Sequence, residues 1–319
     1  MPAKLVAVTD SVFPNLDPAR EVLAKIGAEV RLAEQVPRDA DAILTTYAKI
    51  SADLIQELKQ CRIIARFGIG VDNVDIPAAT NAGIVVTRVP DYCLDEVSDH
   101  TMALLLALVR KIPSSNARTQ GGKWEMRAVV PIHRLRGTVL GLVAFGQIPQ
   151  LVAPKAQSFG IRVVTYDPYV SKPVAERAGV EQVTFDELLK ISDYISIHTP
   201  LLPATRHLFN AEVLSRMKPT AYLINTARGP IIDEAALASA LDQGHLAGAA
   251  LDVMEQEPPS GSPLFGRDNV IVTPHTSFYS EESLVDLQTK AAEEVVRVLS
   301  GQAPRNPVNP EALKAAQSI

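Results

Sequence analysis

Residues 137–168, GTVLGLVAFGQIPQLVAPKAQSFGIRVVTYDP, contain the pattern that decides the fold. The apolar run at 139–145 includes β-branched residues, which predicts a strand buried on both faces of a parallel sheet. Gly146 interrupts that run, and residues 147–159 have a helical pattern closed by a further glycine. A second strand is predicted at 162–166. The stretch therefore indicates a strand, a glycine turn, a helix and a strand.

Asp167 follows the second strand, at the distance from Gly146 where a dinucleotide-binding βαβ unit places the acid that binds the adenosine ribose hydroxyls. The glycine fingerprint is incomplete, because Ala144, Gly146 and Pro149 stand where G-x-G-x-x-G has its glycines. Ala144 adds a methyl group, which the turn tolerates if φ there is negative. Pro149 falls in the first helical turn, where its missing N–H has no intrahelical partner anyway.

The remaining features of the turn suit an anion. Gly146 lets the backbone approach a pyrophosphate, and the amides of Gln147 and Ile148 can face it at the positive end of the helix. An ordinary strand–turn–helix fits the same residues, so the rest of the chain must decide between the two interpretations.

Composition limits the class of protein. At 319 residues and 47% apolar content, the chain is long enough for two domains with hydrophobic cores. A net charge of −5 argues against direct binding to nucleic acid or an anionic membrane. The N-terminal residues enter a strand pattern without a signal sequence, and Cys61 and Cys93 lack a metal-like spacing, so we expect reduced thiols and a cytoplasmic protein.

The first hundred residues alternate short apolar runs with helical patterns, which favours a parallel α/β domain. Strands are predicted at 4–9, 29–32, 42–45, 63–66 and 84–87, and helices at 17–26 and 51–58. The glycines of the segment RFGIGVDNVD, which begins at Arg66, leave backbone amides able to meet an anion, or form a plain glycine turn.

Residues 96–111 predict a helix that is apolar on most of its circumference, ended by Pro113. His100 within it is expected to be a structural histidine. Residues 114–136 have no clear period and carry Trp124, and loops this long are usually functional or clasp a partner. We therefore predict a homodimer.

Further strands are predicted at 194–197, 221–224, 248–251 and 270–272, with helices at 210–217, 233–243 and 282–299. Polar residues follow the carboxyl end of one strand after another, and in an open parallel sheet ligands bind at that edge. These residues are Asp167, His198-Thr199-Pro200, Asn225-Thr226-Ala227-Arg228, Asp252 to Glu257, and Thr273-Pro274-His275.

Three segments extend this pattern into a family resemblance: RFGIGVDNVDIPAATNAGIVV, INTARGPIIDEAALASALDQGHLAGAALDVMEQEP and VTPHTSFYSEESL. They resemble the D-isomer-specific 2-hydroxyacid dehydrogenases over almost the whole chain. VPDYCLDEVSDH and HTSFYSEESL look most like the branch that includes the C-terminal-binding proteins, corepressors that kept the dehydrogenase fold. Phe278 stands where that branch usually has tryptophan.

The resemblance implies two doubly wound parallel-sheet α/β domains. A Rossmann NAD-binding domain, expected at 101–283, is inserted in a flavodoxin-like substrate domain made of 1–100 and 284–319. Pairing through the cofactor domains would form the dimer. No metal is expected.

The resemblance also implies roles for individual residues. The catalytic set maps onto Arg228, Glu257 and His275, and Asp252 falls at a nicotinamide-amide position. Substrate positions are Arg66, Ile69, Gly70 and Phe278; cofactor positions are Gly146, Gln147, Ile148, Asp167, His198, Thr199, Pro200, Thr226, Ala227 and Asp252.

These residue types suit hydride transfer between NAD(H) and a small 2-keto or D-2-hydroxy acid. An arginine can bind the carboxylate and polarise the carbonyl, a histidine can donate the proton, and a glutamate on its other nitrogen fixes the tautomer and stabilises the imidazolium. Two alternatives remain: an NAD(H)-sensing scaffold that binds protein peptides, and a dehydrogenase of another substrate type on the same fold.

Overall fold

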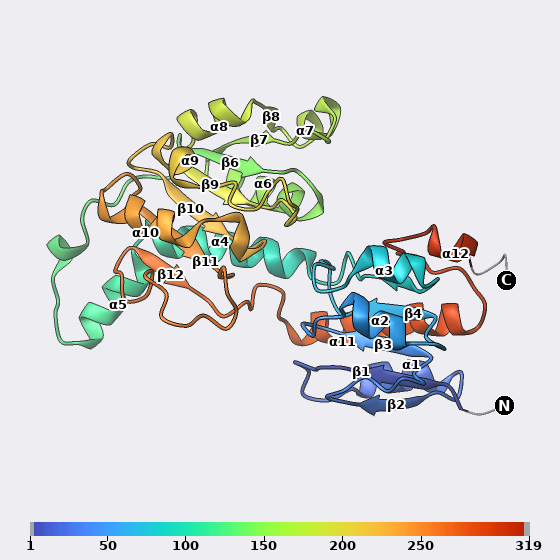
Figure 1. The fold of residues 1–319 in the computed structure, drawn as a ribbon. Coiled ribbons are helices and arrows are strands. Elements are labelled where there is room, and N and C mark those ends of the chain that lie inside the picture. Colours follow the sequence, from blue (N-terminus) through green and yellow to red (C-terminus); the bar gives the residue numbers. More distant parts are fainter. Residues whose placement is uncertain (1–2, 316–319) are drawn as a thin grey trace. The chain divides into compact units, whose positions relative to one another are not determined.

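The computed structural model describes residues 3–315, which fold into two compact units (Figure 1). Unit 1 runs to Cys93 and resumes at Tyr279, and unit 2 comprises Leu94–Phe278. The boundaries expected from the sequence, after residues 100 and 283, fall inside helices α4 (Leu94–Val109) and α11 (Glu281–Leu299). The units divide instead near the start of each helix, because a helix packs as one piece.

Unit 1 is built on a five-stranded parallel sheet of order β2-β1-β3-β4-β5. This is the flavodoxin-like order 2-1-3-4-5. Its strands are β1 (Leu5–Val8), β2 (Glu29–Leu32), β3 (Ala42–Thr45), β4 (Ile63–Arg66) and β5 (Val85–Thr87), and the helices between them are α1 (Asp17–Ala24), α2 (Ala52–Glu57) and α3 (Ile76–Asn81).

The last part of the described chain completes unit 1. Helix α11 packs against α1 and β4. Beyond it, the buried side chain of Asn309 accepts a hydrogen bond from the Val86 amide and donates to the Ile84 carbonyl, at 2.7 and 3.0 Å. The short helix α12 (Ala312–Ala315) follows. Segments far apart in the sequence therefore share one core.

Unit 2 contains a seven-stranded parallel sheet of order β12-β11-β10-β9-β6-β7-β8. The strand order reverses between β6 and β9, which defines the switch point of a doubly wound Rossmann sheet. The strands are β6 (Val139–Val143), β7 (Arg162–Tyr166), β8 (Glu181–Gln182), β9 (Tyr194–Ile197), β10 (Tyr222–Asn225), β11 (Gly248–Leu251) and β12 (Val270–Val272).

Helices cover both faces of this sheet. One buried cluster joins α4 and α6 (Gln147–Ser158) to residues such as Leu140, Ile224 and Ala250. The other joins α8 (Phe185–Ile191), α9 (Ala211–Ser215) and α10 (Glu234–Asp242) to the side chains that point the other way. This arrangement confirms the predicted fold class of two parallel-sheet α/β domains. Within unit 2, it also directs the carboxyl ends of the strands of the sheet to one edge of that sheet.

Some helices were not predicted. Residues 112–120 form α5 (Ile112–Gln120), and η1 (Met126–Val129) lies in the segment that was expected to be irregular. Pro113 does not end α4. Lys111 adopts a left-handed φ of 53°, and the proline then occupies the first turn of α5, where its missing N–H costs no hydrogen bond. Helix α7 (Lys172–Arg177) and the short helix η2 (Gly229–Ile231) were also missed.

Candidate functional site

The glycine turn after β6 leaves room for a phosphate. Gly146 is the N-cap of α6, and a Cβ placed on it would meet nothing within 4 Å. The twelve residues of α6 begin there, so the amides of Gln147 and Ile148 lie in its first turn, at the positive end of the helix dipole. The local geometry therefore fits the pyrophosphate of a dinucleotide.

Ala144 differs from the expectation. Its φ is +78°, in the left-handed region where a side chain costs roughly 1 kcal/mol relative to glycine. The condition of a negative φ is not met, and the turn carries backbone strain at the position where the fingerprint has its first glycine. The Ala144 amide is bound to the Tyr166 carbonyl at 2.8 Å, which holds the turn against β7.

Asp167, at the end of β7, is 7% exposed and binds the glycine turn directly. Its Oδ2 accepts a hydrogen bond of 2.8 Å from the Phe145 amide, and its Oδ1 accepts from the amides of Tyr169 and Val170 at 2.8 and 3.1 Å. The carboxylate is thus fixed beside the phosphate turn. Each oxygen has two lone pairs, so Oδ2 retains acceptor capacity for a ribose hydroxyl.

His198 follows β9 and stays neutral. Burial lowers its pKa to about 3, because desolvation disfavours the charged ring. Its Nε2 lies 2.9 Å from Ser196 Oγ. The next two residues, Thr199 and Pro200, begin the loop towards α9, and the Pro200 carbonyl accepts a hydrogen bond from Thr205. A neutral imidazole here can line a nucleotide site without adding charge.

Arg228 follows β10 on a loop that Asn225 shapes from within. The buried Asn225 side chain accepts from the Ala227 amide and donates to the Arg228 carbonyl, both at 2.9 Å. Thr226 is buried, and its hydroxyl lies 3.0 Å from that of Thr101 on α4. The loop backbone is thereby fixed on both sides of Ala227.

Gly229 allows the loop that carries Arg228 to contact the loop after β11. A Cβ at Gly229 would lie 1.8 Å from the Met254 carbonyl oxygen and 2.5 Å from the Glu255 amide nitrogen. No side chain fits in that space. The segment before Glu257 therefore packs directly against the residue that follows Arg228.

Glu257 and His275 form a hydrogen-bonded pair. His275 Nδ1 lies 2.7 Å from Glu257 Oε2, and Glu257 Oε1 accepts from the Met254 amide at 2.9 Å. His275 has a left-handed φ of 52°, and its ring lies edge-on to Phe278 with the centroids 6.2 Å apart. The fold thus brings these two predicted residues together, in contact with the Arg228 loop through Met254.

Asp252 holds the turn that carries His275. Its carboxylate is 1% exposed and accepts from Thr273 Oγ1 at 2.6 Å and from the amides of Thr276 and Ser277, both at 2.9 Å. His100 on α4 joins this set, because its Nε2 lies 3.1 Å from Thr273 Oγ1. His100 was expected to be structural, and a contact across 173 residues leaves no local signal in the sequence.

Unit 1 presents its own cluster at the carboxyl ends of β3 and β4. Arg66 is 9% exposed, and its guanidinium carbon lies 6.0 Å from the centre of the Tyr47 ring. Gly68 has a φ of 148°, and the guanidinium occupies the space that a Cβ there would take. Ile69 and Gly70 follow in the same glycine segment. This cluster within unit 1 is the predicted substrate-carboxylate position.

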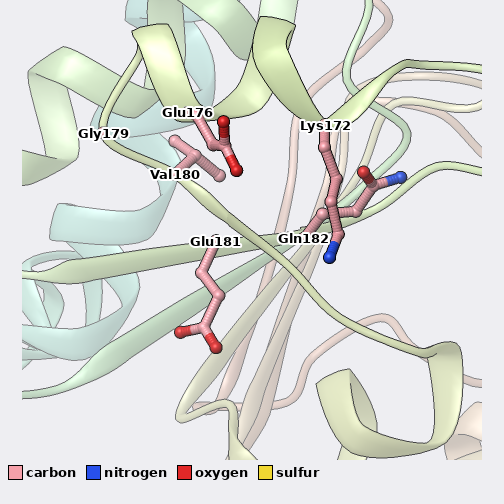
Figure 2. A pocket seen from close by; sticks show the side chains of 6 residues that line it. All are labelled: Lys172, Glu176, Gly179, Val180, Glu181 and Gln182. Atoms are coloured by element: carbon pink, nitrogen blue, oxygen red, sulfur yellow. The ribbon is translucent and has the colours of Figure 1, made fainter.

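A cavity of about 420 Å³ lies elsewhere, at the edge strand β8. Figure 2 shows Lys172 and Glu176 from α7 near Glu181 and Gln182 of β8, a mixture of charges that selects no one ligand. Within residues 3–315, no three His, Cys, Asp or Glu side chains are arranged to hold a metal ion. Nor is any described helix both long and apolar enough to cross a membrane.

Comparison with known proteins agrees with this geometry. Residues 102–277 match the NAD-binding domain of the D-isomer specific 2-hydroxyacid dehydrogenases. The match covers more than half of the chain, and the chain belongs to this family. The matched domain also supports NAD as the cofactor, as predicted.

Individual relatives are dehydrogenases and reductases. The chain is 40% identical over 314 residues to D-3-phosphoglycerate dehydrogenase of Methanocaldococcus jannaschii, covering 95% of this chain but 59% of that protein. It is 37% identical to glyoxylate reductase of Thermococcus litoralis, covering 89% of this chain and 88% of the relative. D-lactate dehydrogenase of Aquifex aeolicus, solved with NAD and lactic acid, superposes with a TM-score of 0.85 at 27% identity over 98% of both chains.

The chain thus spans about three-fifths of the length of the phosphoglycerate dehydrogenases that it matches. The relatives favour the dehydrogenase interpretation over the corepressor alternative. The finer resemblance to the C-terminal-binding-protein branch is not confirmed by them.

Proposed function

We propose that this protein is an NAD-dependent dehydrogenase that interconverts a small 2-keto acid and the corresponding D-2-hydroxy acid. The observation that carries the proposal is the His275–Glu257 pair, 2.7 Å apart, on the same strand edge as Arg228. The glycine turn beside Asp167 lies at that edge as well. A proton donor, an anion-binding arginine and a nucleotide site are thereby available at one edge.

Arg228, His275 and Glu257 have separate roles in the proposed reaction. Arg228 binds the substrate carboxylate through its planar guanidinium and polarises the adjacent carbonyl. His275 donates a proton from Nε2 to the carbonyl oxygen, and Glu257 accepts the hydrogen bond from Nδ1 and stabilises the imidazolium before that transfer. In the oxidation direction, the same nitrogen removes the proton from the hydroxyl.

The nucleotide site uses the groups around the turn. Gly146 and the first amides of α6 would hold the pyrophosphate, and Asp167 the adenosine ribose. Bound NADH supplies the hydride. We propose a preference for NAD over NADP, because the Asp167 carboxylate would repel a 2′-phosphate and the following Pro168-Tyr169 supplies no cation.

The proposed substrate is a class of small acids. Relatives are named for phosphoglycerate, glyoxylate and lactate, which share a carboxylate next to an oxygen-bearing carbon. We propose that Arg66 and the amides near Ile69 and Gly70 can bind a carboxylate within unit 1, and that Phe278 limits the size of the acid beside His275 within unit 2.

The test follows NADH absorbance with purified protein and a panel of glyoxylate, hydroxypyruvate and pyruvate, repeated with NADPH. We expect oxidation of NADH with at least one acid and a lower kcat/KM with NADPH. For hydroxypyruvate and pyruvate, whose products are chiral, the reverse reaction provides a matched control, since the D-hydroxy acid should be oxidised and its L enantiomer should not. NADH binding without turnover across the panel would favour the scaffold interpretation instead.

We further propose a homodimer. Trp124 and Met126 are 90% and 76% exposed, on a segment that also lines a cavity of about 230 Å³ between Arg118 and Val129. Apolar side chains this exposed mark an interaction surface. Sedimentation at micromolar concentration should give a dimer, and Trp124→Ser should shift it towards monomer; a wild-type monomer would contradict the proposal. Cys61 and Cys93 are both buried and form no disulfide, and we propose a reducing, cytoplasmic location.

A further inference from the structure

Two neighbouring polar side chains on helix α4 contact the loops that carry the two central residues of the candidate site. Thr101 Oγ1 lies 3.0 Å from Thr226 Oγ1, two residues before Arg228. His100 Nε2 lies 3.1 Å from Thr273 Oγ1, two residues before His275. One turn of a single helix is therefore linked to both loops.

The available donors and acceptors fix the direction of the hydrogen bond between His100 and Thr273. Asp252 is an acceptor, so Thr273 donates its only hydroxyl proton to Asp252 Oδ1 at 2.6 Å. Thr273 must then accept a hydrogen bond from His100, which requires a proton on Nε2. His100 Nε2 also lies 3.5 Å from Asp252 Oδ1. The His100 imidazole therefore donates a hydrogen bond to the Thr273 hydroxyl, which in turn donates to the buried Asp252 carboxylate.

That carboxylate determines the backbone of the His275 turn. Asp252 accepts the amides of Thr276 and Ser277, and its own carbonyl accepts the His275 amide at 2.8 Å. His275 is held at a left-handed φ of 52°, a conformation that persists only where the surroundings enforce it. Loss of the His100 contact would loosen the anchor of that conformation.

The Thr101 contact acts on the other loop. Thr101 Oγ1 lies 2.8 Å from the Val97 carbonyl, to which it donates, so it accepts from the Thr226 hydroxyl. Thr226 is 8% exposed, and a buried hydroxyl without an acceptor is costly. The helix that carries both side chains is well anchored, since its leucines at 104, 105 and 108 are buried in the core and α4 packs against β10 and β11.

We propose that His100 and Thr101 are positioning residues of the dehydrogenase site, with His100 setting His275 through Thr273 and Asp252, and Thr101 setting Arg228 through Thr226. The proposal rests on the function proposed above. It predicts two different kinetic consequences from adjacent residues, because one loop carries the proton donor and the other the substrate-binding arginine. A merely structural contribution would affect both variants alike.

The test compares four variants with matched shapes. His100→Leu and Thr101→Val remove the hydrogen bonds, whereas His100→Gln and Thr101→Ser keep a donor or hydroxyl near the same place. Asp99→Asn is the control on the same helix, since Asp99 is exposed and pairs only with Lys155 among the bonds described. Thermal unfolding of each variant checks that it is folded.

We expect His100→Leu to lower kcat about 10-fold with KM for the keto acid within about 2-fold, because displaced catalytic groups lose rate without losing binding. Thr101→Val should raise that KM about 10-fold and change kcat less. The conservative variants His100→Gln and Thr101→Ser should retain most of the wild-type kinetics, and the Asp99→Asn control should match wild type. Equal losses in kcat and KM for both disruptive variants, or equal losses in the conservative ones, would overturn the proposal.

A second readout does not need turnover. In spectra of protein labelled with ¹³C at histidine, the His275 signal, identified by its loss in His275→Ala, should move in His100→Leu and stay near its wild-type position in His100→Gln and Thr101→Val. If wild type reduces no acid but this pattern holds, the proposed function fails and the positioning contact stands. An unmoved His275 signal in His100→Leu would refute the contact itself.

Discussion

Two histidine–glutamate pairs lie at the same edge of the unit 2 sheet and look alike in distance and backbone. His275 Nδ1 is 2.7 Å from Glu257, and His207 Nε2 is 2.6 Å from Glu255. Both histidines have a left-handed φ, 52° and 50°. Each follows the carboxyl end of a strand, and each touches the neighbourhood of the Arg228 loop, His207 through its amide bonded to the Pro230 carbonyl.

The difference lies in which ring nitrogen meets the carboxylate. His275 uses Nδ1, the nitrogen nearer the backbone, so the tip of the ring is directed away from Glu257. His207 uses its tip, Nε2, and its glutamate belongs to a local network in which Glu234 also accepts from Ser262. A histidine held by Nδ1 can act on a ligand, whereas one held by its tip fastens two loops. The pair alone therefore does not define a proton donor.

Replacing the two histidines separates the pairs most sharply. His275→Ala should lower kcat for keto-acid reduction on the order of 10³-fold, because the proposed proton donor is lost, and leave NADH binding nearly unchanged. His207→Ala should leave kcat within about 3-fold and lower the unfolding temperature instead. Steady-state kinetics measure kcat, fluorescence titration measures NADH binding, and thermal melts measure the unfolding temperature of each variant. Similar kinetic losses in both variants would break the distinction.

The loop that carries Arg228 contacts the surroundings of both pairs, through Gly229 against Met254 and through the Pro230 carbonyl that accepts the His207 amide. Arg228→Lys keeps the charge but loses the planar fork, so kcat/KM should fall on the order of 10²-fold. The same change on a background of His207→Ala should cost the same factor, since independent sites add. A double-variant loss that is much smaller than the product would place His207 in the substrate site.

A third histidine limits the pH range of these experiments. Folding lowers the pKa of His198 to about 3 from an unfolded value of 6.5, so the unfolded chain binds the extra proton first as pH falls. The stabilisation is present above pH 6.5 and is lost progressively towards pH 3, by about 2 kcal/mol at pH 5. Urea unfolding of His198→Asn should show a flatter dependence than wild type between about pH 7 and 5; parallel curves would contradict the assignment.

The two glutamates should differ in their effect on the pH profile. Glu257→Gln removes the carboxylate that accepts the hydrogen bond from His275 Nδ1, so the pH at which keto-acid reduction falls should move down. Glu255→Gln should leave the profile in place. The measurement is kcat/KM from about pH 5.5 to 9 for wild type and both variants. A profile that shifts equally in both would remove Glu257 from the proton step.

The smallest expected effect concerns the strained backbone at Ala144. Ala144, like both histidines, has a left-handed φ, but it has no polar side chain whose hydrogen bond could compensate. Ala144→Gly should therefore raise the free energy of unfolding by about 1 kcal/mol. Chemical denaturation measures it, with Ala153→Gly inside α6 as a control that should destabilise. A loss of stability in Ala144→Gly would show that the turn is relaxed.

The strands were predictable because their residues are locally consistent. β3, β4, β7 and β11 begin and end at the predicted residues, where glycines, prolines or polar residues bound short apolar runs. Strand order along the sheet edge placed Arg228, Glu257 and His275 among the polar residues that follow strand ends, since the carboxyl ends of parallel strands coincide. The family resemblance, not periodicity or topology, selected these three residues as the expected catalytic set.

Other features depend on contacts that no local pattern contains. Helix α5 was missed because Pro113 was interpreted as a stop, although it fits equally well in a first turn. The positive φ at Ala144 occurs together with the hydrogen bond of its amide to the last residue of β7. The role of His100 depends on Thr273, and the nitrogen that each histidine uses depends on the backbone around it. These are tertiary properties.

The burial of both cysteines has a practical consequence for spectroscopy. Cys61 and Cys93 are buried, and burial raises the pKa of the Cys61 thiol to about 12, so alkylating reagents should find little thiolate at Cys61 in the folded protein. A cysteine introduced on the surface of unit 2 should thus accept a dye selectively without removal of the native thiols. Both native thiols belong to unit 1, so the rate at which they are labelled would measure the local unfolding of that unit alone.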